Sequence, residues 1–312
     1  MDEKDMSIFR RFWIYQKERF PVFQTGMLIA AFTFSAAAYS RILRGEPGFL
    51  QPYWLLAGIF TAFGFFLLLR LFDEFKDRED DAKFRPYRPV PRGLVSLKEI
   101  GWGIVITIAL MVLVNLILMP VMIWALLLGL LYILLMWREF FVPEWLRRHP
   151  FAYLVSHMLV MPLIDFYTTG LDWLNANAPM PRGLFLFLIV TFLNGCVIEI
   201  GRKIRAPQDE EEGVETYSVL LGSKQAAYLW LGLLTVTGGI AFACYWLAGY
   251  GLRALPVLLP VWAACAFPAV RFIRTKKGAA KIELAAGVWT IAMYLTIGGV
   301  PMLIEWGGKL WN

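Results

Sequence analysis

The sequence RLFDEFKDREDDAKFRPYRPVPRGLVS, at residues 70–96, joins the end of an apolar segment to a proline-rich turn. Asp73, Asp77 and Asp81 recur in it every four residues, so a helix that continues from the apolar segment carries all three along one face. Like charges at this spacing repel one another and destabilise an isolated helix. The pattern therefore predicts that a cation lies beside these carboxylates.

Two kinds of cation fit this prediction. Basic side chains of the same stretch would leave an ordinary solvated helix end of mixed charge. A divalent metal is the other candidate, because Mg²⁺ binds a few carboxylate oxygens together with phosphate oxygens and water. We predict a magnesium site with Asp73, Asp77 and Asp81 as its ligands.

The prolines at positions 86, 89 and 91 follow the acidic residues. Proline lacks an amide hydrogen and restricts the residue before it, so we expect the helix to end here and the chain to stiffen. Arg85, Arg88 and Arg92 would then stand near the carboxylates, and we predict that they bind phosphate. The preference of basic residues for the cytoplasmic side of a membrane would also place arginines here.

The composition of the whole chain indicates a membrane protein. Of its 312 residues 59% are hydrophobic and 17% are charged, whereas soluble domains have about 45–50% and about 25%. Nine apolar segments are long enough to cross a hydrocarbon layer of about 30 Å. They lie at about 22–40, 52–72, 99–118, 120–136, 151–171, 183–203, 227–248, 253–272 and 284–304. The sequence thus predicts an all-α fold, a polytopic bundle of nine transmembrane helices that forms one membrane-embedded domain over residues 1–312.

The distribution of lysine and arginine predicts the orientation. With the N-terminus in the cytoplasm, the inside segments hold 25 of these residues and the outside segments hold 5. We therefore expect a cytoplasmic N-terminus, an external C-terminus and a location in the inner membrane of a bacterium. The loops at 73–98 and 199–225, which hold most of the acidic residues, would share the cytoplasmic face. The net charge of +6 follows mostly from this topology and requires no nucleic-acid partner.

The second acidic loop follows the sixth apolar segment. Glu199 and Lys203 are four residues apart at the end of that segment, an acidic run follows at 209–212, and Asn194 lies inside the segment. Polar and ionisable groups at such positions are costly, and they are functional candidates by default. The three cysteines lie within apolar segments without metal-ligand spacing, so we expect them to be buried packing residues (Cys196, Cys244 and Cys265).

At these two loops the chain resembles the UbiA superfamily of intramembrane prenyltransferases, whose members share a nine-helix bundle. The first motif of that family is Asn/Asp-x-x-x-Asp-x-x-x-Asp, usually with a second acid after its first residue, and an Arg-Pro-x-Pro-x-Gly turn follows it. Asp73, Glu74, Asp77 and Asp81 fill the acidic places in order, and residues 88–93 match the turn as RPVPRG.

The second motif of the family is an Asp-x-x-x-Asp pair, followed after about four residues by Gly-x-x-Thr. Residues 213–216 match that tail as GVET, but the aspartate pair is altered, since Lys203 follows Glu199 at the helix end. In one interpretation Lys203 contacts the diphosphate directly, and a second metal ion is held weakly or not at all. In the other, Glu199 and Asp209 supply metal ligands from either side of a kinked segment that contains Pro207.

The resemblance implies Mg²⁺-dependent transfer of an isoprenyl group from a prenyl diphosphate to an aromatic or other lipid-soluble acceptor. Negative charge on the leaving diphosphate would be stabilised by the metal and by basic side chains, and the allylic cation by aromatic faces. The resemblance also implies that Asp73 and Asp77 are catalytic residues. We expect metal ligands at Glu199 and Asp209, a catalytic and diphosphate-binding role for Lys203, and substrate contacts from Arg205 and Asn194. The expected partners are the donor, a small lipophilic acceptor and membrane lipids, without nucleic acid.

The fifth apolar segment is the most polar of the nine. We predict that Tyr153 contacts the substrate, and that His157 contacts the acceptor or takes a proton from it. A lone histidine in a membrane helix also commonly bonds to a neighbouring helix, which is the simpler interpretation. Asp165 is expected to be a structural residue paired within the bundle.

Three other functions remain open at this point. A terpene cyclase on the same scaffold would ionise the same donor, but the cation would be captured by the double bonds of the substrate itself. A transporter would hold ions at broken helices near the midplane, whereas the acidic residues here cluster at one face. A purely structural membrane protein would give Asp73, Asp77 and Asp81 no reason to lie in line.

Overall fold

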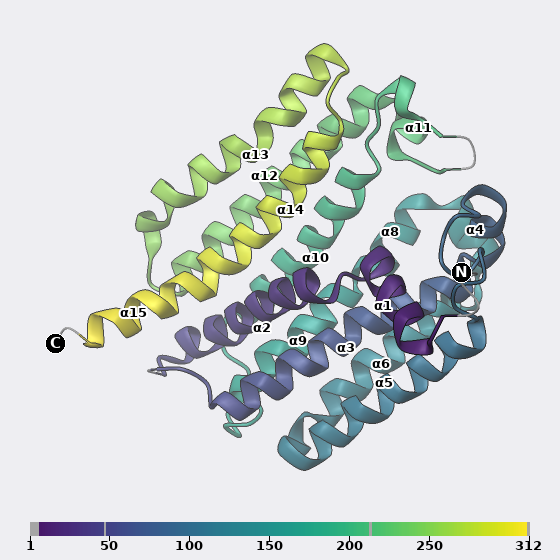
Figure 1. Ribbon diagram of the computed structural model, residues 1–312. Coiled ribbons are helices and arrows are strands. Elements are labelled where there is room, and N and C mark those ends of the chain that lie inside the picture. Colours follow the sequence, from purple (N-terminus) through teal and green to yellow (C-terminus); the bar gives the residue numbers. More distant parts are fainter. Residues whose placement is uncertain (1–5, 47, 212–213, 311–312) are drawn as a thin grey trace.

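The computed structural model describes residues 6–46, 48–211 and 214–310, and within these ranges every regular element is a helix (Figure 1). Nine helical stretches among the described residues are long and apolar enough to cross a membrane, which confirms the predicted fold class. They are α2 (Val22–Arg44), α3 (Pro52–Lys76), α5 (Leu97–Leu118), η2 with α6 (Pro120–Met122, Ile123–Trp137), α8 with α9 (Pro150–Met158, Val160–Trp173), α10 (Leu184–Arg202), α12 (Ser223–Leu247), η5 with α13 (Gly251–Ala254, Leu255–Thr275), and α14, η6 and α15 (Ala280–Tyr294, Leu295–Gly299, Val300–Leu310). The predicted separation of the apolar segments 99–118 and 120–136 is correct, because α5 ends at Leu118 and a short 3-10 turn separates it from α6.

Short helices gather at one end of the bundle, which we call the charged end. They are α1 (Ile8–Arg19), α4 (Arg78–Phe84), η3 (Glu139–Phe141), α7 (Pro143–Arg148), η4 (Pro207–Asp209) and α11 (Tyr217–Leu221). Figure 1 shows α1, α4 and α11 at this end, while α15 and the C-terminus lie at the opposite end. The charged end therefore collects the segments that carry both acidic motifs.

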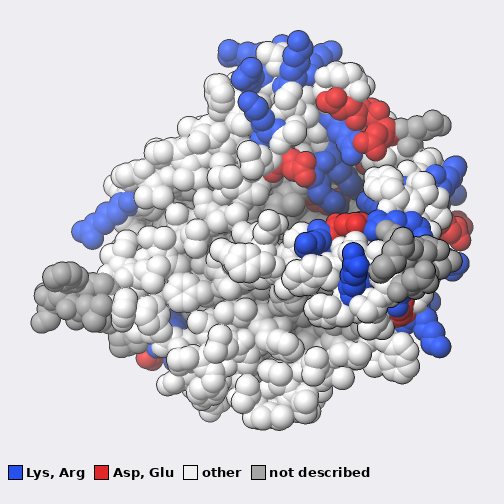
Figure 2. Space-filling view, viewed as in Figure 1, with Lys and Arg blue, Asp and Glu red and all other residues white. Residues whose placement is uncertain are grey.

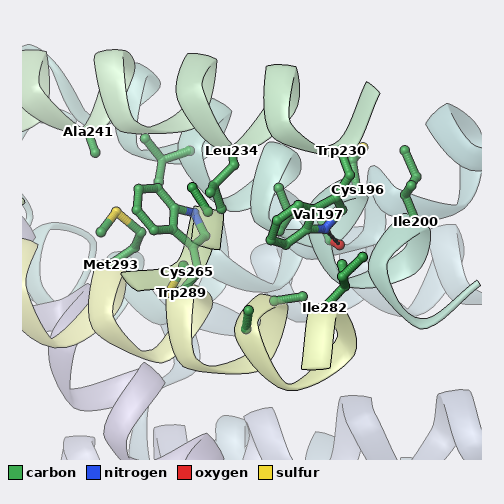
Figure 3. Close-up of a cluster of buried hydrophobic side chains, with 14 of the residues drawn as sticks. Cys196, Val197, Ile200, Trp230, Leu234, Ala241, Cys265, Ile282, Trp289 and Met293 are labelled. Atoms are coloured by element: carbon green, nitrogen blue, oxygen red, sulfur yellow. Dashed lines mark hydrogen bonds between the residues drawn. The ribbon is translucent and has the colours of Figure 1, made fainter. Parts of the chain in front are cut away.

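The buried apolar side chains form two large clusters, one in each half of the chain. The first lies mainly among α3, α5, α6 and α9, and the second among α10, α12, α13 and α14. In the second cluster the indoles of Trp230 and Trp289 fill the space between α10, α12 and α14 (Figure 3). The Trp230 indole donates a hydrogen bond of 2.9 Å to the carbonyl oxygen of Val197, which satisfies its only polar group. The cysteines are buried and unpaired, as expected.

The close contact between the last span and α2 depends on a glycine. A Cβ atom added at Gly298 would lie 2.0 Å from the carbonyl oxygen of Ser35, so only glycine fits against α2 at this point. Gly298 belongs to η6, a single π-helical turn that begins directly after Tyr294. Such turns insert an extra residue into the helix and change the direction in which neighbouring side chains point.

The N-terminal helix α1 is tied to the charged end by side-chain contacts. Arg11 forms an ion pair with Glu99 and donates a hydrogen bond of 3.1 Å to the carbonyl oxygen of Leu94. Glu18 accepts a hydrogen bond of 2.7 Å from Arg92 of the proline-rich turn. These contacts fix α1 over the loop that follows the first acidic motif.

Candidate functional site

The three aspartates of the first motif keep a common line although the helix is interrupted. α3 ends at Lys76 and α4 begins at Arg78, with Asp77 between them. The Asp77 amide donates to the Asp73 carbonyl at 2.8 Å, and the Asp81 amide donates to the Asp77 carbonyl at 2.8 Å. The four-residue repeat of backbone hydrogen bonds therefore runs through the junction. α4 ends at Phe84, just before the first proline of the turn, as predicted.

Asp81 is buried and surrounded by arginines. Its carboxylate accepts hydrogen bonds from Arg88 at 2.6 and 2.7 Å and from Arg85 at 3.2 Å, and Arg19 lies 4.0 Å away. Two of the three arginines predicted to bind phosphate thus contact the third predicted metal ligand in this structure. The structure places Arg92 apart from them, against Glu18 of α1.

Glu74 lies behind the line of aspartates. Its side chain is 1% exposed, and it accepts hydrogen bonds from Arg19 at 2.6 Å and from Tyr15 at 3.3 Å. Both donors come from α1 and lie more than fifty residues away in sequence. Glu74 therefore connects the first motif to the N-terminal helix.

Asp73 and Asp77 are far less engaged than their neighbours. Asp73 is 43% exposed at its side chain and has a contact of 3.6 Å with Arg70, which is long for a hydrogen bond. Among the described residues, the Asp77 carboxylate makes no hydrogen bond or ion pair. Burial and the neighbouring Asp81 raise the pKa of Asp77 above the usual range of an aspartate. The carboxylates of Asp73 and Asp77, one helical turn apart, thus have oxygens available to a ligand.

Lys76 belongs to a second cluster, which the sequence motifs did not indicate. Its ammonium lies 2.8 Å from the Tyr153 hydroxyl, 3.2 Å from Nε2 of His157 and 2.9 Å from a carboxylate oxygen of Glu139. The structure therefore brings together Tyr153 and His157, both predicted from the polar fifth segment, around a lysine of the first motif. The position of Lys76 inside an acidic repeat was the feature of the sequence that could have singled it out. Its partners could not be identified in this way, because they come from helices that pack beside it only in the folded bundle.

The turn that carries Glu139 has an unusual backbone. Glu139, Phe140 and Phe141 have φ angles of 47°, 53° and 62°, in the left-handed region that residues other than glycine seldom adopt. The Phe140 ring meets the His157 ring edge-on with centroids 6.2 Å apart. The strained turn thus holds an anionic side chain and an aromatic ring against the Lys76 cluster.

The second motif brings cations to the same region. Glu199 is buried and forms ion pairs with Arg202 at 2.6 Å and with Lys203 at 3.0 Å. Arg202 lies within electrostatic reach of Asp73, and the Lys203 ammonium lies 6.0 Å from the centre of the Tyr153 ring. The ends of α3 and α10 therefore lie near each other at the charged end. The prediction was that the two acidic loops share one face of the bundle.

The remaining residues of the second motif lie farther out. Asp209 is exposed in η4, and its carbonyl oxygen accepts a hydrogen bond of 3.3 Å from Arg205, which also pairs with Glu211 at 2.8 Å. Thr216 caps α11 through a hydrogen bond of 3.1 Å from the amide of Val219. Gly213 of the predicted motif tail lies outside the described residues. The structure does not bring the Asp209 carboxylate to Glu199.

Two further observations complete the site. Asn194 is 1% exposed, and neither polar atom of its side chain has a hydrogen-bond partner among the described residues. The described part of the chain contains no group of three histidine, cysteine or acidic side chains arranged to hold a metal ion. Asp73 and Asp77 are the residues of the first motif that the described basic side chains engage least, so they are the ones that could hold a metal ion.

In the view of Figure 2, charged residues gather around a recess at one end of the molecule, whereas the sides of the bundle that this view shows carry few charges. Acidic and basic side chains alternate around that recess. The uncharged sides are those that nine transmembrane helices would present to lipid.

Comparisons with known proteins agree with this arrangement. The chain has 14% identity and a TM-score of 0.65 to a solved structure that concerns digeranylgeranylglyceryl phosphate synthase in membranes, covering 94% of this chain and 99% of that one. It has 16% identity and a TM-score of 0.64 to the apo structure of a UbiA homologue from Aeropyrum pernix K1, covering 89% of this chain and 98% of that one. No match was found among curated proteins. The model of the UbiA prenyltransferase family matches residues 27–295, and the chain, an integral multi-pass membrane protein, therefore belongs to that family.

Proposed function

We propose that this protein transfers an isoprenyl group from a prenyl diphosphate to a lipid-soluble acceptor, with Mg²⁺ bound at Asp73 and Asp77. The observation that carries the proposal is the contrast within the first motif. Glu74 and Asp81 are neutralised by arginines, whereas Asp77 has no ion-pair partner among the described residues and Asp73 has only a long contact. Because arginines neutralise Glu74 and Asp81, the other two acids, Asp73 and Asp77, are available to a metal ion that binds together with the substrate.

The donor set fits Mg²⁺ rather than a metal that needs a complete protein cage. Mg²⁺ usually keeps one or two carboxylates together with phosphate oxygens and waters, and Asp73 and Asp77 offer that number. When bound, the metal would neutralise charge that develops on the leaving diphosphate. Asp81, whose oxygens are held by Arg85 and Arg88, would orient these arginines beside the site.

Basic side chains at the ends of two helices would bind the diphosphate. Lys76 comes from α3, and Arg202 and Lys203 come from the end of α10 on the opposite side. Each is paired with a glutamate in this structure, Lys76 with Glu139 and the other two with Glu199. Arg202 and Lys203 have donors left for the diphosphate, since a guanidinium has five and an ammonium three. The three donors of Lys76 face Tyr153, His157 and Glu139, so Lys76 would exchange one of these contacts for the diphosphate. The altered second motif thus supplies positive charge where the family's pattern supplies a second aspartate.

Aromatic rings flank the place where the prenyl cation would form. The Tyr153 and His157 rings are stacked with centroids 3.7 Å apart, and Phe140 closes the edge of the pair. A cation over an aromatic face gains about 0.5–2 kcal/mol. These rings would exclude water from the cation, and Tyr153 would position Lys76 by its hydroxyl.

The proposed orientation places the charged end in the cytoplasm, where prenyl diphosphates and Mg²⁺ are available. It rests on the excess of basic residues in the loops at that end. We further propose that residues 1–312 act as one membrane-embedded unit in a bacterial inner membrane.

The test is release of diphosphate from a prenyl diphosphate by the purified protein in lipid nanodiscs, with and without added acceptor. Asp73→Asn and Asp77→Asn should each lower the rate at least about a hundredfold, because the metal loses a ligand in the transition state. Asp80→Asn is the matched control, since Asp80 lies in α4 but is exposed, and its rate should stay unchanged.

Near-normal rates in both motif variants would refute the metal role. Products also separate transfer from its nearest alternative. Cyclic hydrocarbons or terpene alcohols formed without an acceptor would favour a cyclase.

A further inference from the structure

The N-terminal helix α1 has two opposite faces, of which the bundle uses the inner one. Arg11, Tyr15 and Arg19 follow one another every four residues along the inner face. Arg11 donates a hydrogen bond of 3.2 Å to Glu99, and the other two donate to Glu74. A helix turns through about 100° per residue, so side chains two positions before each of these three point to the opposite side.

The outer face carries an aromatic pair and a lysine at those positions. Phe9 and Trp13 are 76% and 52% exposed, and their rings stack with centroids 6.3 Å apart. The Lys17 ammonium lies 5.5 Å from the centre of the Trp13 ring, and the neighbouring Arg10 is exposed. Neither Lys17 nor Arg10 forms an ion pair among the described residues. Exposed rings gathered in this way indicate an interaction surface.

The inner face of α1 rests on the side of the bundle. Phe20, the residue after the helix, is buried and meets the Phe63 ring edge-on with centroids 5.2 Å apart. Phe63 precedes Glu74 by eleven residues in α3, which corresponds to roughly 16 Å toward the middle of that span. The chain thus passes from α1 to a point beside α3, and Figure 1 shows α1 crossing in front of α3 near the charged end. The outer face therefore points sideways, away from the bundle.

This outer face continues into the surface that the first span presents to lipid. Val22, Phe23 and Met27 lie at the start of α2, directly after α1, and all three are exposed. Tryptophan is enriched where acyl chains meet headgroups, and lysine and arginine reach from that level to the phosphates. A helix with one aromatic and basic face is typical of segments that lie in this plane.

We propose that the outer face of α1 binds the phospholipid layer at the charged end of the bundle. Phe9 and Trp13 insert between the headgroups, where their rings leave water, and Arg10 and Lys17 contact lipid phosphates. The partner is phospholipid because the face combines apolar rings with positive charge and adjoins the lipid-facing side of α2.

The same helix connects the bilayer to the first acidic motif. The Arg19 guanidinium contacts Glu74 at 2.6 Å and lies 4.0 Å from Asp81 of α4. Lipid that holds the outer face of α1 therefore also holds Arg19 against these two acids. That this influence reaches prenyl transfer rests on the proposed function, whereas the lipid contact and its effect on α4 do not.

Photo-crosslinking of the full chain tests the lipid contact, in nanodiscs of phosphatidylcholine and phosphatidylglycerol. With p-benzoylphenylalanine in place of Phe9, or of Trp13 in a second variant, illumination should give phospholipid adducts that mass spectrometry detects. The same group in place of Phe267, which is 64% exposed within α13, is the positive control. Gln208, exposed in η4, is the position for the negative control.

Lipid adducts at position 267 but at neither position of α1 would overturn the proposal. Adducts at position 208 in the same yield would do so too, as would adducts of α1 with a second copy of the chain in place of lipid. Lipid adducts in a protein that releases no diphosphate would support the lipid contact and refute the transfer reaction. Diphosphate release without lipid adducts at α1 would do the reverse.

Amide hydrogen exchange in the same nanodiscs tests the connection to the motif. Trp13→Ser should raise the exchange rates of α1 and of residues 78–84 in α4 at least about threefold, because α1 is then held less firmly. Trp246→Ser removes an indole of similar exposure, 58%, at the other end of the bundle and should leave both segments unchanged. Unchanged exchange after Trp13→Ser, or an equal rise after Trp246→Ser, would overturn the connection.

Discussion

The Lys203 ammonium lies 3.0 Å from the Glu199 carboxylate, at the place where the family's second motif has two aspartates. Together with Arg202, it neutralises that glutamate with two positive charges. The second motif is therefore cationic on balance at the helix end. This favours direct contact with a diphosphate over a second metal ion.

Changing Lys203 to aspartate tests this difference. Lys203→Asp would put a second carboxylate one helical turn from Glu199 and should increase the number or affinity of bound metal ions. Titration of Mg²⁺ against diphosphate release measures the change. Lys224→Asp makes the same charge change at an exposed lysine and should leave the titration unaltered. If both variants titrate like the unaltered protein, Lys203 points away from the metal.

Substitutions at Lys76 and at Glu139 should change the KM for the prenyl diphosphate in opposite directions. Lys76→Met removes a cation from the proposed diphosphate site and should raise the KM for the donor about tenfold or more. Glu139→Gln removes the anion that Lys76 contacts at 2.9 Å and should lower that KM severalfold. Steady-state kinetics with a single prenyl diphosphate measure both values. A shift in the same direction for both variants would show that the pair acts only in stability.

The pH dependence of metal binding follows from Asp77. Burial and Asp81 raise the pKa of Asp77, so its proton competes with Mg²⁺ at a higher pH than the proton of an ordinary aspartate does. Without metal, the contribution of Asp77 to stability decreases as pH rises from the ordinary aspartate pKa through the raised one. As pH is lowered, the affinity for Mg²⁺ should therefore begin to fall at a pH above the usual range of an aspartate pKa. Asp77→Asn should remove that dependence.

The ion pair between Arg19 and Glu74 predicts a large effect on stability. Glu74→Ala leaves the Arg19 guanidinium buried without its partner at 2.6 Å, and such losses cost about 3–5 kcal/mol. The Tm in nanodiscs should fall, and α1 should become accessible to protease. The double variant Arg19→Met, Glu74→Leu should recover much of the loss, because it removes both charges. A double variant as unstable as Glu74→Ala would show that the unpaired charge of Arg19 does not cause the loss of stability.

Local patterns in the sequence predicted the parts of the site that depend on helical spacing. The line from Asp73 to Asp81 and the end of α4 before the prolines both involve residues a few positions apart. The nine spans followed from apolar length, which a bilayer imposes directly.

Such local patterns could not predict contacts between distant segments of the chain. Lys76 meets Tyr153 across 77 residues, and Arg19 meets Glu74 across 55. Either contact depends on how helices pack and on the path of short connecting turns, such as the left-handed turn at Glu139. The motifs therefore located the acids of the charged end, but not which of them the fold itself would neutralise.

The attachment of α1 to Glu74 has a consequence for where the functional protein begins. The family model starts at residue 27, yet Tyr15 and Arg19, which lie before that point, hold an acid of the first motif. A chain trimmed to the recognised family region would keep every proposed metal ligand while uncovering a buried carboxylate beside them. Truncations, domain fusions and N-terminal tags should therefore preserve the first helix together with the bundle.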